Sequence, residues 1–143
     1  SGKVLHFGTH NAGRLALHIC KTMLTTMLSD NQAGFVKIKD LGIKLTEEIQ
    51  SISKKNNKNK MICQGVNSMF QIFFTDQEKI CNYRDFCRSV DRIKFRNFAL
   101  KLFDKGIYMN PSATLHSLSS IIHTEKDIEV TARAIAETLD EMP

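Results

Sequence analysis

The spacing of apolar residues changes along this chain, and this change limits the folds open to it. Residues 11–28 and 32–54 carry apolar side chains three and four positions apart, which is the period of an amphipathic helix. Residues 29–31 between them are turn formers. Residues 68–75 instead alternate with the period of a strand, after a strand-like segment at 61–66. We therefore predict two helices followed by two strands.

The next helix has a start signal and a stop signal. Ser89 or Asp91 begins it, and Gly106 stands at the position after its end, where glycine adopts positive φ without strain. Residues 76–88, which precede this helix, are polar and without periodicity. We expect them to form a loop, the kind of segment that often carries function.

A capping signal marks the last helix. Thr124 and Asp127 have the spacing of a capping box, and the apolar residues after them recur with helical period. Before this helix we expect two short strands, at residues 107–109 and around 118–122. The full order predicts an α+β fold: a three- to four-stranded, mainly antiparallel sheet with helices mostly on one face, preceded by a long N-terminal linking helix.

Two features each allow two interpretations. Gly42 inside the second helix marks either a close crossing of another element or a tolerated surface glycine. The basic stretch Lys54–Lys60 is either a loop that binds nucleic acid or a solvated connection from helix to strand. The solvated connection is favoured, because no aromatic residue is interleaved for base stacking.

Composition excludes several classes of protein. With 143 residues, 42% of them hydrophobic and 24% charged, the chain fits one globular domain rather than a disordered or collagen-like one. The net charge of +5 suits a solvated surface as well as a nucleic-acid partner. No apolar run approaches the length of a membrane span. Ser1-Gly2 resembles a cleavage scar, in which case the chain begins in the middle of a longer protein.

The sequence contains no pattern that is typical of a metal site. The four cysteines, Cys20, Cys63, Cys81 and Cys87, lack the paired spacing of zinc ligands, and the histidines stand in no ligand pattern with carboxylates. We expect reduced thiols in a cytoplasmic protein, and no metal site.

One short motif points to an anion. Gly8 and Thr9 stand directly ahead of the first predicted helix. A glycine that lets backbone approach, a hydroxyl and the amides of a helix start together suit a phosphate. Gly-Thr before a helix is also common without any ligand, so both interpretations stay open.

Several segments, taken in order, resemble the C-terminal part of the class-III (fold-type-I) aminotransferases, the glutamate-1-semialdehyde 2,1-aminomutases in particular. These enzymes use pyridoxal 5′-phosphate (PLP). The resemblance extends from Phe7 to about Leu139 and is carried by Gly8–Ala12, Gly65–Phe74, Asn82-Tyr83, Lys105–Ser112 and Ser120–Ile128.

The resemblance implies an enzyme that moves an amino group through a cofactor Schiff base, as a homodimer acting on a small amino, keto or semialdehyde substrate. Gly8 would position a loop whose Thr9 hydroxyl bonds the PLP phosphate of the neighbouring subunit. Residues 1–31 would be the end of the large domain and the interdomain linking helix, and residues 32–143 the C-terminal small domain. It implies neither a nucleic-acid nor a membrane partner.

The same resemblance implies that the chain alone is inactive. The Schiff-base lysine of the family lies upstream of the Gly-Thr motif, and Lys44, Lys101 and Lys105 match helical surface positions instead. We therefore expect no catalytic residue here. The helix at 11–28, which would pack on the large domain in an intact enzyme, is expected to expose its apolar stripe and favour self-association.

Two departures from the family concern the site. Gly13-Arg14 replaces the Asn-Pro of many members, which affects helix initiation more than chemistry. Residues 113–116 offer Ala, Thr, Leu and His where true aminomutases carry an acidic residue near the cofactor. The substrate is therefore expected to differ from glutamate semialdehyde, while a general transfer of an amino group remains what the resemblance implies.

Two other functions remain as alternatives. One is a stand-alone, non-catalytic interaction module of the same fold. The other is a nucleic-acid binder that uses Lys54–Lys60, which salt-dependent binding to generic DNA or RNA would reveal.

Overall fold

The computed structural model describes residues 13–143, and its first helix, α1 (Arg14–Lys55), is interrupted. Ser29 has extended backbone, and Asp30, Asn31 and Gln32 have φ values of 49°, 54° and 65°. Such left-handed backbone cannot continue a right-handed helix. The predicted turn at residues 29–31 is therefore confirmed, and the two predicted helices are the two parts of α1.

The chain divides into two compact units, the first ending at Val36 and the second running from Lys37 to Pro143. In the first unit most apolar side chains of α1 face solvent, as predicted, although Met27 is buried. Those at least half exposed are Leu15, Leu17, Ile19, Met23, Leu24, Leu28 and Val36.

The second unit contains a three-stranded antiparallel sheet of β1 (Met61–Val66), β2 (Met69–Phe74) and β3 (Ser117–Leu118). The strand order is β1-β2-β3, so β2 is central. Its residues pair with β1 in a hairpin register that sets Cys63 opposite Ile72, and with β3 through Met69 and Leu118. The predicted α+β class and antiparallel sheet are confirmed.

Helix α3 (Arg92–Asp104) begins and ends as predicted. The Asp91 side chain caps it by accepting the Lys94 N–H at 2.8 Å. At its end Gly106 has a φ of 80°, and its N–H donates to the carbonyl of Phe103. The Ile107 N–H donates to the carbonyl of Leu102 at 2.9 Å, which completes a Schellman motif.

That motif explains why the predicted strand at residues 107–109 is wrong. The Ile107 N–H donates to the last turn of α3, so it cannot donate to a neighbouring strand of the sheet. Met109 is buried in the core outside the sheet. The strand expected around residues 118–122 exists only as Ser117–Leu118, and a turn follows it.

The segment predicted as a polar loop, residues 76–88, contains most of a short helix, α2 (Tyr83–Ser89). The Asn82 side chain accepts the Asp85 N–H at 3.0 Å and so caps it. Phe86 anchors it in the core, where its ring lies 6.0 Å from that of Phe73.

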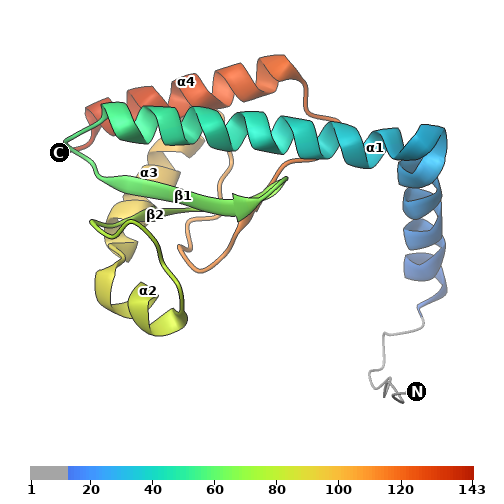
Figure 1. Ribbon diagram of the computed structural model, residues 1–143, viewed down its shortest axis with the longest axis horizontal. Coiled ribbons are helices and arrows are strands. Elements are labelled where there is room, and N and C mark those ends of the chain that lie inside the picture. Colours follow the sequence, from blue (N-terminus) through green and yellow to red (C-terminus); the bar gives the residue numbers. More distant parts are fainter. Residues whose placement is uncertain (1–12) are drawn as a thin grey trace. The chain divides into compact units, whose positions relative to one another are not determined.

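Helices cover the sheet unequally. On one face, Phe74 packs its ring 5.3 Å from Phe98 of α3, and the part of α1 from Lys37 onward lies with α4 (Glu125–Glu141) above the same sheet (Figure 1). The short α2 lies on the other side of the sheet (Figure 1), where its Phe86 packs against Phe73. The helices of the second unit thus lie mostly on one face, as predicted, and the capping box of Thr124 and Asp127 is present at the start of α4.

Gly42 marks a close crossing. A Cβ atom at this position would lie 2.4 Å from the carbonyl oxygen of Asn67, in the turn of the β1–β2 hairpin. Only glycine lets α1 approach the hairpin this closely.

Over residues 13–143, none of the helices combines the length and the hydropathy that crossing a bilayer requires.

Candidate functional site

The predicted cofactor-binding residues, Gly8 and Thr9, lie outside the described residues. What the structure describes is the helix that follows them. The carbonyl of Gly13 accepts the Leu17 N–H at 2.9 Å, and the first turn of α1 contains Arg14 and no acidic residue. The start of a helix carries a partial positive charge, so a cation such as Arg14 is unfavourable there on its own. An anion at this place would be stabilised by both the helix dipole and Arg14. The described start of α1 is therefore compatible with a phosphate.

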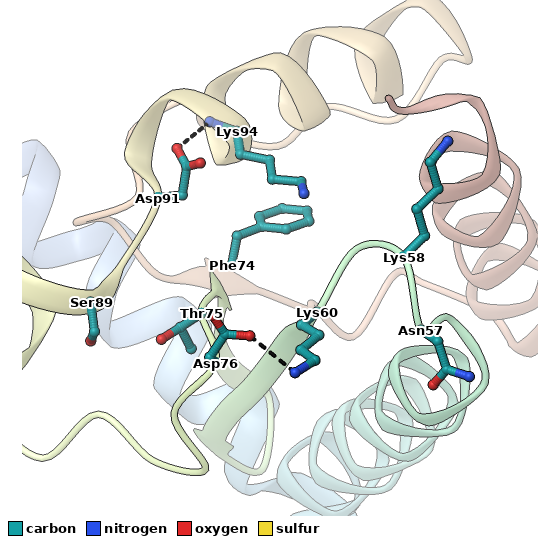
Figure 2. A pocket seen from close by; sticks show the side chains of 9 residues that line it. All are labelled: Asn57, Lys58, Lys60, Phe74, Thr75, Asp76, Ser89, Asp91 and Lys94. Atoms are coloured by element: carbon teal, nitrogen blue, oxygen red, sulfur yellow. Dashed lines mark hydrogen bonds and ion pairs between the residues drawn. The ribbon is translucent and has the colours of Figure 1, made fainter.

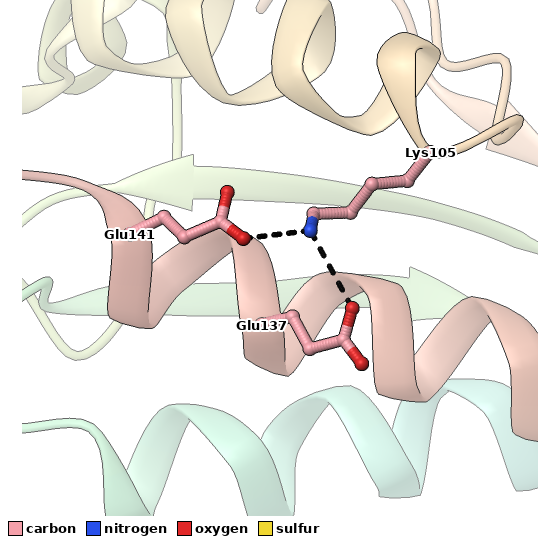
Figure 3. Close-up of polar contacts among 3 residues, drawn as sticks. All are labelled: Lys105, Glu137 and Glu141. Carbon is pink, nitrogen blue, oxygen red and sulfur yellow. Dashed lines mark hydrogen bonds and ion pairs between the residues drawn. The ribbon is translucent and has the colours of Figure 1, made fainter.

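Lys105 is held by two carboxylates of α4 (Figure 3). Its Nζ lies 2.7 Å from Oε1 of Glu141 and 3.4 Å from Oε2 of Glu137. The hydrogen bond to Glu141 is the main cause that raises the pKa of Lys105 and lowers the pKa of Glu141. An amine held in its protonated form has no lone pair with which to attack a carbonyl.

Lys44 is held in the same way. Its Nζ donates to Oε2 of Glu125 at 2.9 Å, and this hydrogen bond raises its pKa. Lys101 lies in the last turn of α3, where a cation complements the helix dipole. Lys44 and Lys105 therefore have roles in holding helices, and neither has the environment of a nucleophile.

A cleft of about 340 Å³ gathers three other lysines, Lys58, Lys60 and Lys94 (Figure 2). Lys60 is paired with Asp76 at 3.2 Å, and Asp91 also lines the cleft. Two carboxylates thus offset two of the three ammonium groups. The excess of positive charge is small.

Among residues 13–143, the cleft offers no surface on which a base could stack. Its aromatic side chain, Phe74, is only 1% exposed and lies beneath Lys94, whose Nζ is 5.8 Å from the ring centroid (Figure 2). Stacking on an aromatic ring is what single-stranded nucleic acid requires. The geometry gives no support to the nucleic-acid alternative.

The segment that departs from the aminomutase pattern is fixed to the sheet. Gln71 of β2 donates a side-chain hydrogen bond to the carbonyl of Ala113, and Asn110 accepts the Ser112 N–H at 3.0 Å. Leu115 and His116, which follow, are exposed. The loop is therefore positioned by Gln71, a polar residue in an otherwise apolar strand whose role the sequence pattern did not reveal.

Comparison with known proteins agrees with the family resemblance, although no protein-family model matches the chain. The glutamate-1-semialdehyde 2,1-aminomutase of Alkaliphilus oremlandii is 35% identical over 141 residues, 99% of this chain and 31% of that enzyme. The enzyme of the same name from Clostridium kluyveri is 34% identical over 108 residues, 76% of this chain and 25% of that enzyme. The chain spans about a third or less of the length of the curated relatives it matches.

Solved structures share the fold at lower identity. A glutamate-1-semialdehyde-aminomutase from Pseudomonas aeruginosa aligns with the whole chain at a TM-score of 0.79 and 13% identity, over 31% of its own length. A β-phenylalanine aminotransferase from Variovorax paradoxus aligns with 96% of the chain at a TM-score of 0.76 and 21% identity, over 30% of its own length. The chain is thus homologous to part of the glutamate-1-semialdehyde 2,1-aminomutases and has the fold of the matching part of class-III aminotransferases.

Proposed function

We propose that the chain is the C-terminal part of a PLP-dependent class-III aminotransferase or aminomutase that moves an amino group on a small substrate. The observation that carries this proposal is the 35% identity to an aminomutase over 99% of the chain. Two structural neighbours are described as a transaminase with PLP bound and an aminomutase in complex with PMP. PLP, when bound, supplies an electron sink for bonds to the carbon that bears the amino group.

The chain's own contribution to the cofactor is the hydroxyl of Thr9, presented by Gly8 to the phosphate across a homodimer interface. The Arg14 cation and the acid-free first turn of α1 support a dianion at this end of the helix. Residues 1–31 would then be the end of the large domain with the linking helix, and residues 32–143 the small domain of a cytoplasmic enzyme.

The chain alone would be inactive, because the lysine that anchors PLP would belong to the preceding part of the enzyme. The ion pairs of Lys44 and Lys105 support this, since both amines are stabilised as ammonium ions. Purified chain incubated with PLP and borohydride should therefore show no lysine labelled above the level of a denatured control.

A chimera tests the function directly. The chain replaces the matching third of the Alkaliphilus oremlandii aminomutase, and both PLP binding and amino-group transfer are measured. We expect the chimera to bind PLP and to turn over, because every matched segment keeps its place. A folded chimera that does not retain PLP would contradict the proposal.

Variants at one position test the phosphate contact within that chimera. Thr9→Val keeps the shape and removes the hydroxyl, so PLP affinity should fall by about tenfold, the effect of one hydrogen bond to a charged group. Thr9→Ser keeps the hydroxyl and should retain most of the affinity. Equal affinities for the two variants would show that Thr9 does not bind the phosphate.

A further inference from the structure

The two faces of the β1–β2–β3 sheet differ in what they bury. The helices of the second unit lie mostly on the face that carries Phe70, Ile72 and Phe74, each at most 3% exposed (Figure 1). Successive side chains of a strand point to opposite faces, so Met69 and Gln71 of β2 belong to the other face. We call this second face the open face.

A row of apolar side chains crosses the open face at the hairpin end. Val66 pairs with Met69, and Met69 pairs with Leu118, so the three side chains project from the same face, one from each strand. Val66 is 70% exposed, Leu118 63% and Met69 45%. We call these three residues the apolar row. A solvated sheet face normally carries polar side chains, so an apolar row is typical of a sheet that is covered on both faces.

The rest of the open face is also uncharged. Gln64 and Gln71 form the next pair on this face, and their side-chain amides donate to the carbonyls of Ile80 and Ala113. Beyond them lies a cleft of about 470 Å³, and none of the residues that line it within the described part of the chain is charged. Aromatic side chains make up much of this lining, namely those of Phe73, Tyr83 and Phe86.

The outer side of the helices has the opposite character. The groove between α1 and α4 is lined by Lys44, Glu48, Glu129 and Arg133, two cations and two anions. Charged side chains suit a surface that stays in water, whereas the centre of an interface is depleted of them. The helix side of the second unit is therefore suited to solvent, and the open face is suited to another apolar surface.

The relatives of the chain are long enough to supply that surface. The chain corresponds to 31% of the Alkaliphilus oremlandii enzyme and to 31% of the Pseudomonas aeruginosa structure, so the larger part of such an enzyme lies outside it. A domain that belongs to the same polypeptide has a high effective concentration at the open face, which favours it over a free partner or a second copy.

We propose that the open face, with the apolar row at its hairpin end, is the surface on which the preceding part of the same enzyme packs through uncharged, mainly apolar side chains. This inference rests on the proposed function. The sheet would then be the middle layer between its own helices and the preceding part, which is a common way to bury both faces of a sheet.

Hydroxyl-radical labelling followed by mass spectrometry tests this packing. The chain alone is compared with the chimera described above. In the chimera Met69 and Leu118 should be oxidised at least about fivefold more slowly, because a covered side chain reacts only when the contact opens. Ile93 and Leu100 of α3 are the controls, since both are at least half exposed and lie outside the sheet, and their rates should not change.

The possible outcomes separate this inference from the proposed function. A chimera that retains PLP but oxidises the apolar row as fast as the chain alone does, or that protects Ile93 and Leu100 equally, would overturn the inference and leave the function standing. A folded chimera that does not retain PLP would remove both. Protection of the row in the chain alone that increases with protein concentration would identify a second copy as the occupant and would also overturn the inference.

A double variant measures the contribution of the row. Val66→Thr keeps the branched shape and Leu118→Gln the length, and both make the row polar. In the chain alone these exposed substitutions should leave the urea midpoint nearly unchanged, whereas in the chimera they should lower the melting temperature by at least about 4 °C. Ile93→Gln, at a residue 76% exposed, is the matched control. A shift in the chimera no larger than that of the control would contradict the proposal, and if the double variant does not fold, the oxidation of Met69 in the unmodified proteins still decides.

Discussion

Replacing Gly42 by alanine tests the packing of α1 on the β1–β2 hairpin. The added Cβ would lie 2.4 Å from the carbonyl oxygen of Asn67, 2.5 Å from the Cα of Ser68 and 2.6 Å from the carbonyl carbon of Asn67. Ordinary contact begins at 3.4 Å, so the helix and the hairpin would have to separate by about 1 Å. Both partners are backbone, and no side-chain rotation relieves the overlap.

The sign of the effect on stability is diagnostic. Glycine-to-alanine in an unobstructed helix stabilises a protein by about 1 kcal/mol. Overpacking of a filled site costs about 1–3 kcal/mol. Because three backbone atoms overlap the added Cβ at once, the cost lies in the upper part of this range. After the helix gain is subtracted, we expect Gly42→Ala to lower the free energy of unfolding by about 1–2 kcal/mol, or the melting temperature by about 3–8 °C.

Urea unfolding followed by circular dichroism at the helix band measures this change, and amide shifts report its place. The largest shifts should occur at Asn67 and Ser68, with little change at Gly106, which lies at the end of α3. Glu47→Ala, an exposed substitution in the same helix, serves as the control and should change stability by less than about 0.5 kcal/mol. If Gly42→Ala is as stable as the unmodified chain or more so, α1 does not cross the hairpin as described.

Three further predictions concern α4 and the thiols. Thr124→Ala removes the capping box and should cost about 1 kcal/mol in urea unfolding, whereas Thr124→Ser should retain most of the stability. Lys105→Gln should lower the melting temperature at pH 7 and low salt, because it removes the ion pairs with Glu137 and Glu141. In about 1 M salt, which screens these charges, the same substitution should hardly change the melting temperature. The pKa of Glu141 is lowered in the folded state, so the stability that its ion pair contributes is present above the pKa of the unfolded state and is lost as the pH falls through the pKa of the folded state. The pKa of Lys105 is raised, so its contribution to stability is lost at strongly alkaline pH, as the pH rises through the pKa of the folded state. Cys63 is buried and has its pKa raised to about 12, so a thiol reagent should label only the three exposed cysteines until the protein unfolds; rapid labelling of all four would refute its burial.

Periodicity predicted the long elements well, because burial imposes it directly. The alternation in residues 68–75 became β2, with Phe70, Ile72 and Phe74 in the core and Phe73 buried by α2. Likewise the residue types at 29–31 predicted the break in α1, since Asp and Asn adopt left-handed backbone more readily than most residues.

The errors fall on short segments, where capping bonds outweigh periodicity. Helix α2 has seven residues, too few for an apolar stripe, yet Asn82 followed by Asp85 was a readable start signal. Conversely, Ile107–Met109 looks like a strand, but the Ile107 amide had already been used to end α3.

The clefts could not be predicted in the same way. Ser119, for example, is held against Ser68 by a hydrogen bond between segments about fifty residues apart, a contact that no local pattern predicts. Thr124 and Asp127, by contrast, were recognisable from their spacing, and that spacing placed the carboxylate at the start of α4.

The late position of α4 in the chain has a consequence for synthesis. Its residues Ile128, Ile135 and Leu139 are at most 2% exposed, and they complete a core that also contains Ile49 and Phe98. On the ribosome, the hairpin and α3 leave the exit tunnel before this covering helix does, so their apolar surfaces meet water first. Nascent chains that lack α4 should therefore bind chaperones, and release should coincide with the emergence of this helix from the exit tunnel.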